Sequence, residues 1–120
     1  MAASKHAIYY CMNADIIREY ALSKANAEES FPFGENTLVF KTNGKIFLLL
    51  SLDADPLQFN VKCDPEKALQ LREEYPDTVL PGYHMNKKHW NTVLADGSIP
   101  LKKLKEFIDD SYALVSKGKK

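Results

Sequence analysis

Residues 80–93 hold the densest group of chemically capable side chains in this sequence. The run contains the only Trp of the chain, Trp90, two of its three His, a Tyr and the pair Lys87 and Lys88. Adjacent cations engage phosphate, an amide such as that of Asn86 can reach a base edge, and aromatic rings stack on bases. The composition of this run therefore points first to nucleic-acid binding.

A tight turn would bring these side chains together. We expect Tyr83 to Met85 and His89 to Leu94 to pair as a hairpin, with Asn86, Lys87, Lys88 and His89 at its tip. A Lys pair at a turn is often only a solvated loop, and a Trp inside an alternating strand is usually a core residue. The two interpretations are compatible if Trp90 packs inward beneath an exposed Lys pair.

Two other chemistries are weaker alternatives. His84, His89 and Cys63 could form a metal site or a Cys–His nucleophile, but they lack the close paired spacing of zinc motifs, and no pattern places a base beside the thiol. The sequence has no G-x-S-x-G, Walker or Gly-rich dinucleotide motif. We therefore expect a non-enzymatic protein with no catalytic residues, no metal site and no cofactor.

Aromatic residues around a Pro and a Gly can line a groove. The segment Phe31-Pro32-Phe33-Gly34 has this composition, and Phe33 together with Tyr83 and Trp90 would line a small-molecule or peptide groove. The favoured alternative is structural: Phe31 and Phe33 pin the first helix to the sheet.

Length and composition indicate a single domain over 1–120. Lys and Arg total 16, as do Asp and Glu, so the net charge is zero, which counts against strong nonspecific DNA binding, although 78–105 holds five bases and one acid. Two unpatterned Cys, no apolar stretch of about 20 residues and no signal-peptide core favour a soluble, cytoplasmic protein away from membranes. We expect a monomer or weak dimer.

Periodicity and turn signals predict the elements that would position these residues. In chain order they are a helix over 13–24 capped by Asn13, a short edge strand or irregular stretch over 27–33, strands over 37–41, 45–51 and 57–62, a helix over 64–75, the hairpin of 83–85 and 89–94, and a helix over 98–116. The strongest local signals are the Asn43-Gly44 turn and the cap Asp64 followed by Pro65.

Hydrophobic patterning predicts how these elements pack. Phe47 to Leu50 is apolar on both faces, so its strand should be central and covered by helices. Ala68, Leu69 and Leu71 should form the apolar side of the middle helix. The expected fold is α+β: a mainly antiparallel twisted sheet of five to six strands, with the N- and C-terminal helices on one face and the middle helix linking the two hairpin regions.

Three motifs carry a resemblance over nearly the whole chain: Phe31-Pro32-Phe33-Gly34, Lys62-Cys63-Asp64-Pro65 and the stretch from Pro81 to Val93. In this order they look like the MmcQ/YjbR family of small bacterial proteins. Its members are described as similar in fold to frataxin/CyaY and as DNA-binding proteins of the double-wing type. The resemblance therefore implies a CyaY/YjbR-like fold and double-stranded DNA as the partner.

The leading hypothesis is a DNA-binding, transcription-associated protein, and two alternatives stay open. In the leading hypothesis the turn of Asn86, Lys87, Lys88 and His89 is one wing, and the neighbourhood of Lys41 and Lys45 is the second. The first alternative is a protein-interaction or small-ligand adaptor that uses the sheet face or the groove of Phe33, Tyr83 and Trp90. The second is a frataxin-like metal binder, for which the acids of the first helix are sparse.

Overall fold

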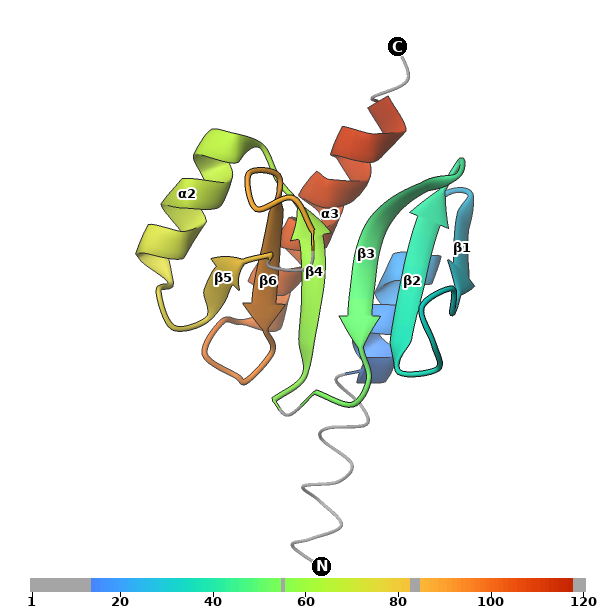
Figure 1. The fold of residues 1–120 in the computed structure, drawn as a ribbon, viewed down its shortest axis with the longest axis horizontal. Coiled ribbons are helices and arrows are strands. Elements are labelled where there is room, and N and C mark those ends of the chain that lie inside the picture. The colour runs from blue at the N-terminus through green and yellow to red at the C-terminus, as the bar shows by residue number, and fades with distance from the viewer. Residues whose placement is uncertain (1–13, 55, 83–84, 118–120) are drawn as a thin grey trace, which may run out of the picture.

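The computed structural model of this protein describes residues 14–54, 56–82 and 85–117. These residues form three helices and a six-stranded antiparallel sheet of order β1-β2-β3-β4-β6-β5, as Figure 1 shows. The elements are a helix over 14–22, β1 (Ala27–Ser30), β2 (Thr37–Thr42), β3 (Lys45–Ser51), β4 (Gln58–Lys62), α2 (Pro65–Glu74), β5 (Val79–Pro81), β6 (Trp90–Leu94) and α3 (Leu101–Lys117). Asn13, Tyr83 and His84 lie outside the described residues.

The main hydrophobic core lies between the sheet and its helices. The helix over 14–22 and α3 cover the same face of the sheet (Figure 1), and both contribute side chains to one buried cluster with the Phe residues of the strands. The middle helix, α2, adds Ala68 and Leu71 to this cluster near β5. The predicted α+β arrangement is therefore confirmed, but Leu69 is 57% exposed and does not belong to the apolar side of α2.

The first hairpin forms as predicted. Asn43 and Gly44 both have positive φ, 52° and 83°, and Thr42 pairs with Lys45, which is the geometry of a two-residue type I′ turn. The pairing then shifts between Phe40 and Lys41, so that β3 carries one extra residue, Phe47. This β-bulge explains why consecutive residues of β3 are buried in the same core, and bulges bend the strand that contains them.

A hydroxyl from α3 joins β3 to β4 where their pairing ends. The last paired residues are Leu48 and Val61, and beyond them β3 curves away from β4 (Figure 1). Ser111 is fully buried at this point: its Oγ accepts from the Lys62 N–H at 2.8 Å and donates to the Phe47 carbonyl at 2.6 Å. One side chain thus satisfies two backbone groups that the bulge separates.

The predicted pairing of 83–85 with β6 falls mostly outside the described residues, which exclude Tyr83 and His84; Met85, the described residue of that segment, belongs to no strand. β6 pairs with β4 on one side and with β5 on the other. Gly82 allows the close approach of the two strands, because a Cβ at this position would lie 2.8 Å from the Cβ of Trp90. The Trp90 N–H donates to the Asn86 carbonyl at 3.0 Å, so the chain before β6 folds into a local turn instead of a continued ladder.

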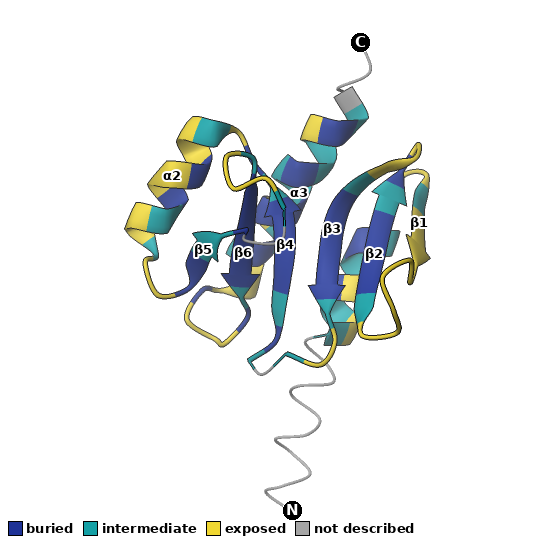
Figure 2. Ribbon diagram, viewed as in Figure 1, coloured by how far each residue is buried: buried dark blue, intermediate teal, exposed yellow. Residues whose placement is uncertain are grey.

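No helix formed by the described residues covers the second face of the sheet. Val39, Leu49 and Trp90 form a small separate cluster there, with Ile46 and Met85 packed against it, so the prediction that helices cover both faces of β3 is wrong. Figure 2 shows that β2, β3, β4 and β6 are nonetheless mostly buried. On the helix-free face, side chains of neighbouring strands and of the connection between β5 and β6 bury the apolar residues.

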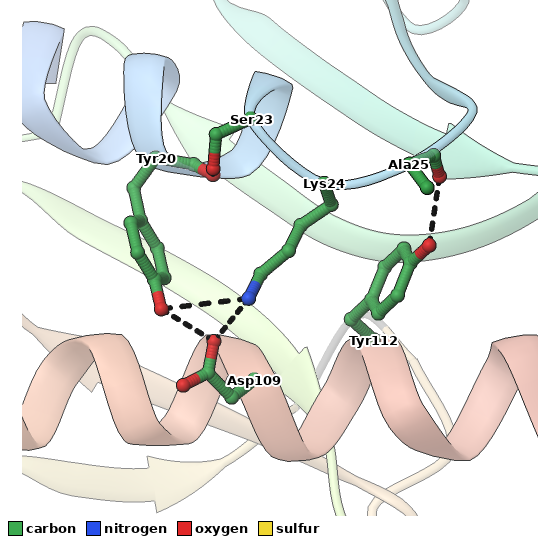
Figure 3. A network of polar contacts seen from close by, with 6 residues as sticks. All are labelled: Tyr20, Ser23, Lys24, Ala25, Asp109 and Tyr112. Atoms are coloured by element: carbon green, nitrogen blue, oxygen red, sulfur yellow. Dashed lines mark hydrogen bonds and ion pairs between the residues drawn. The ribbon is translucent and has the colours of Figure 1, made fainter.

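A polar network fastens the helix over 14–22 to α3 (Figure 3). The Tyr20 hydroxyl donates to Asp109 Oδ1 at 2.6 Å, Lys24 forms an ion pair with the same oxygen, and the Tyr112 hydroxyl donates to the Ala25 carbonyl at 2.7 Å. Partial burial acts to raise the pKa of Asp109, but the hydrogen bonds from Lys24 and Tyr20 outweigh it and leave that pKa below its usual value. The network therefore favours the folded state when Asp109 is ionised.

Candidate nucleic-acid interface and sheet-face groove

Two turns lie at the same end of the sheet. They are the tip of the β2–β3 hairpin and the connection between β5 and β6, both at the upper edge of Figure 1, on either side of the divergence between β3 and β4. We call residues 41–46 the hairpin wing and residues 85–89 the connection wing. The predicted binding residues of the described chain are therefore divided between two turns that could face one partner.

The hairpin wing presents one cation on each of its faces. Lys41 pairs with Ile46 and lies on the helix-free face, whereas Lys45 pairs with Thr42, whose hydroxyl donates to Ala25 on the helix side. Lys45 is exposed and Lys41 is half-buried. A partner that contacts both must approach the end of the hairpin.

The connection wing is exposed at its tip. Asn86, Lys87 and Lys88 are exposed and His89 is half-buried. The Asn86 Oδ1 accepts from the Lys88 N–H at 2.9 Å, and the Asn86 amide nitrogen donates to no described residue. The predicted tip therefore exists, although a local turn and not a tight hairpin presents it.

An arginine that the sequence analysis did not single out holds the connection wing in place. Arg72 of α2 donates from Nε to the Asn91 Oδ1 at 2.7 Å, and its terminal nitrogen donates to the Lys87 carbonyl and, at 3.4 Å, to the Trp90 carbonyl. A guanidinium can make several directed hydrogen bonds at once. Its position on the helix gave no sequence signal of this role, because its partners lie 15 to 19 residues away.

Three lysines of the two wings, Lys41, Lys45 and Lys88, could meet an anionic partner. None of the ion pairs between described residues includes Lys41, Lys45 or Lys88. Glu28 lies opposite Lys41 across β1 and β2, yet no ion pair forms between them. Charges with no protein partner can exchange their counterions for phosphates at little cost.

Trp90 is a core residue. Its side chain is 8% exposed and packs with Val39 and Leu49, with Met85 of the connection wing against it. The interpretation of Trp90 as a core residue is confirmed, and its ring is too enclosed to stack on a base. It therefore supports the connection wing from below.

A groove opens on the helix-free face, with a volume of about 410 Å³. Its lining combines apolar and uncharged polar side chains from three strands, the β1–β2 loop and the connection wing: Phe33, Thr37, Leu49, Ser51, Gln58, Asn60 and Met85. Phe31 and Phe33 are 50% and 65% exposed, so the prediction that they pin the first helix to the sheet is wrong. Of the three predicted groove residues, Phe33 lines the groove, Trp90 does not, and Tyr83 lies outside the described chain.

The weaker metal and nucleophile sites gain no support in the described part of the chain. No three His, Cys, Asp or Glu side chains gather there in a way that could hold a metal ion. Cys63 is buried on the helix side, and burial raises the pKa of its thiol, which disfavours the reactive thiolate. Among the described helices, none has the length and apolar character needed to cross a bilayer.

Comparisons with known proteins agree with this fold. Residues 22–114 match the family model named YjbR. The chain is 42% identical to Escherichia coli O157:H7 protein YbdF and 31% identical to Escherichia coli K12 protein YjbR, in each case over 84% of this chain and 82% or 85% of the relative. A crystal structure of a Deinococcus radiodurans protein, described as a DUF419 domain, superposes with a TM-score of 0.82 at 40% identity over 86% of this chain and 78% of that one. The names of these relatives state no ligand or activity.

Proposed function

The chain belongs to the YjbR family, and we propose that it is a non-enzymatic DNA-binding protein whose two wings contact the backbone of one duplex. The observation that supports this most is the placement of Lys41, Lys45 and Lys88, which have no ion-pair partner among the described residues, on two turns at one end of the sheet. Phosphate contacts of this kind set affinity and register on DNA.

Local charge reconciles this function with a chain of zero net charge. Nonspecific attraction requires cations concentrated on one surface, and the total charge of the protein matters less at physiological ionic strength, where the Debye length is about 8 Å. The four ion pairs between described residues neutralise cations elsewhere, on the helix over 14–22, the turn after it, α2 and α3. The wings therefore keep the cations that a phosphate backbone would meet.

Base recognition would fall to the connection wing. Asn86 is exposed and its amide nitrogen donates to no described residue, and side-chain amides recognise base edges in the major groove. His89 is the other polar side chain of this wing that is not a Lys. A transcription-associated role requires such sequence preference, so it depends on Asn86 and His89 more than on the lysines.

The test compares two double variants that remove the same charge. Lys45→Ala with Lys88→Ala removes one cation from each wing, and Lys102→Ala with Lys103→Ala removes two from the start of α3. Fluorescence anisotropy of a labelled mixed-sequence duplex at low salt should show about tenfold weaker binding for the wing variant, with a salt slope smaller by about two. The α3 variant should bind as the wild type does.

Equal losses in the two variants would indicate general charge attraction and would refute the role of the wings. A wild type that fails to bind any duplex at low salt would refute the DNA-binding function itself.

A further inference from the structure

The helix-free groove is built from two rows of side chains across the strands. Pairing places Thr37, Ser51 and Gln58 in one row, and Leu49 beside Asn60 in the next. Apart from Leu49, these side chains are neutral hydrogen-bonding groups, and none of the described residues that line the groove is charged. A ligand bound over these strands would therefore contact the hydroxyls and amides of uncharged side chains.

One groove residue has an unused donor although its side chain is almost fully buried. Asn60 is 7% exposed, and its Oδ1 accepts from the Thr92 hydroxyl at 2.5 Å. No described residue accepts from its amide nitrogen, and no buried side-chain nitrogen or oxygen among the described residues lacks a partner. The amide nitrogen of Asn60 is therefore not fully enclosed, and because Asn60 lines the groove, this nitrogen can donate to a ligand there.

An exposed aromatic ring borders the same groove. Phe33 is 65% exposed, which is costly for a large apolar side chain unless something covers it. Met85, a flexible apolar residue of the connection wing, also lines the groove. A planar ligand that lies over the strands of the groove could be covered by Phe33 and Met85. The edge of the same ligand could then form hydrogen bonds with the side-chain amides of Gln58 and Asn60.

We infer that this groove is a binding site for a nucleobase, which stacks on Phe33 and accepts a hydrogen bond from the Asn60 amide nitrogen. A nucleobase is planar and uncharged, and it carries donors and acceptors along one edge, as the hydroxyl and amide lining requires. A volume of about 410 Å³ lies in the range of small-ligand sites. The base can belong to a free nucleoside or to an unpaired position of a single strand.

The site stands apart from the proposed function. Nucleosides have no phosphate, so their binding does not require the lysines of either wing. If the groove binds nucleosides, the variant Lys45→Ala with Lys88→Ala should keep that affinity while it loses duplex binding. Failure of one proposal is therefore distinguishable from failure of the other.

The experiment is a titration of the full chain, labelled with ¹⁵N, with each of adenosine, guanosine, cytidine and thymidine. At least one nucleoside should shift the side-chain amide signals of Asn60 and Gln58. Phe33→Ala should weaken that binding by about tenfold, because stacking on an aromatic side chain supplies much of the affinity for a base. Phe31→Ala is the matched control, since Phe31 is also exposed but does not line the groove, and it should bind as the wild type does.

A short single-stranded oligodeoxynucleotide then distinguishes the source of the base. Shifts at Asn60 with both ligands would assign the groove to an unpaired base of a strand, and shifts with nucleosides alone would assign it to a free nucleoside. No shift at Asn60 with any of these ligands would overturn the inference. It would also be overturned if Phe33→Ala and Phe31→Ala bound equally well.

Discussion

Replacing Ser111 with Ala should destabilise the protein more than any other loss of a single hydroxyl from α3. The Ser111 Oγ is the partner of the Lys62 N–H at 2.8 Å and of the Phe47 carbonyl at 2.6 Å, at the point where β3 and β4 separate. The site is fully buried, so water cannot replace the hydroxyl without rearrangement. Leaving buried polar groups without partners costs about 1–3 kcal/mol.

A second serine on the same helix supplies the control. The Ser116 Oγ donates only to the Ala113 carbonyl of its own helix, at 3.4 Å. Both substitutions gain the higher helix propensity of Ala, a few tenths of a kcal/mol, so the difference between the two variants isolates the bridge between strands. We expect Ser111→Ala to be about 1–3 kcal/mol less stable than Ser116→Ala.

Urea denaturation followed by far-UV circular dichroism measures this difference. The slope of unfolding free energy against urea should stay the same in both variants, so that the midpoint alone reports the change. Equal midpoints for Ser111→Ala and Ser116→Ala would refute the role of the hydroxyl in joining β3 to β4. Because the wings lie on either side of this junction, we also expect Ser111→Ala to weaken duplex binding.

Three further substitutions test contacts that hold β5 against β6, the first helix against α3, and the connection wing in place. Gly82→Ala should destabilise the fold by about 1–3 kcal/mol, because the added Cβ would lie 2.8 Å from Trp90 Cβ, and an unchanged urea midpoint would contradict this. Asp109→Asn should lower the melting temperature at pH 7, where Asp109 is ionised and paired with Lys24. Because the hydrogen bonds from Lys24 and Tyr20 hold the pKa of Asp109 below its usual value, this difference from the wild type should shrink only as pH falls below the usual range of an aspartate and through the lowered pKa. A melting-temperature difference that does not change with pH would refute this. Arg72→Lys should speed hydrogen exchange at the Trp90 amide, and unchanged protection would show that Arg72 does not hold the connection wing.

The features that were predictable from the sequence are those fixed by neighbouring residues. The Asn43-Gly44 turn requires positive φ at two consecutive positions, which few other pairs of residues supply, and the hairpin follows from it. The start of α2 was equally local, with Asp64 accepting from the Glu66 N–H at 3.3 Å and Pro65 in the first helical turn. The strand predicted over 57–62 was also local, because Phe59 and Val61 alternate with polar residues and both lie in the main core.

The errors arose where contacts distant in sequence decide the structure. The pairing of β5 with β6 was not predicted, because it depends on the close approach of the backbone at Gly82 to Trp90. The exposure of Phe33 could not be foreseen, since it depends on a helix-free face that composition does not reveal. The bulge at Phe47 is satisfied by a residue more than 60 positions away, Ser111.

The candidate site was predictable in composition but not in arrangement. The sequence supplied Asn86, Lys88 and the lysines of the hairpin, whereas the placement of both turns at one end of the sheet required the strand order. Asn60 attracted no notice because an isolated Asn in a strand carries no motif. Its importance follows from its burial and its unused donor, which only the packed structure reveals.

The proposal that both wings bind one duplex is tested most directly by mapping the amide signals that shift when a short DNA duplex is added to the ¹⁵N-labelled protein. We predict that the shifts concentrate in residues 41–46 and 85–89 together and rise with the same dissociation constant. Shifts confined to α3 and the helix over 14–22, or to one wing alone, would contradict the proposal.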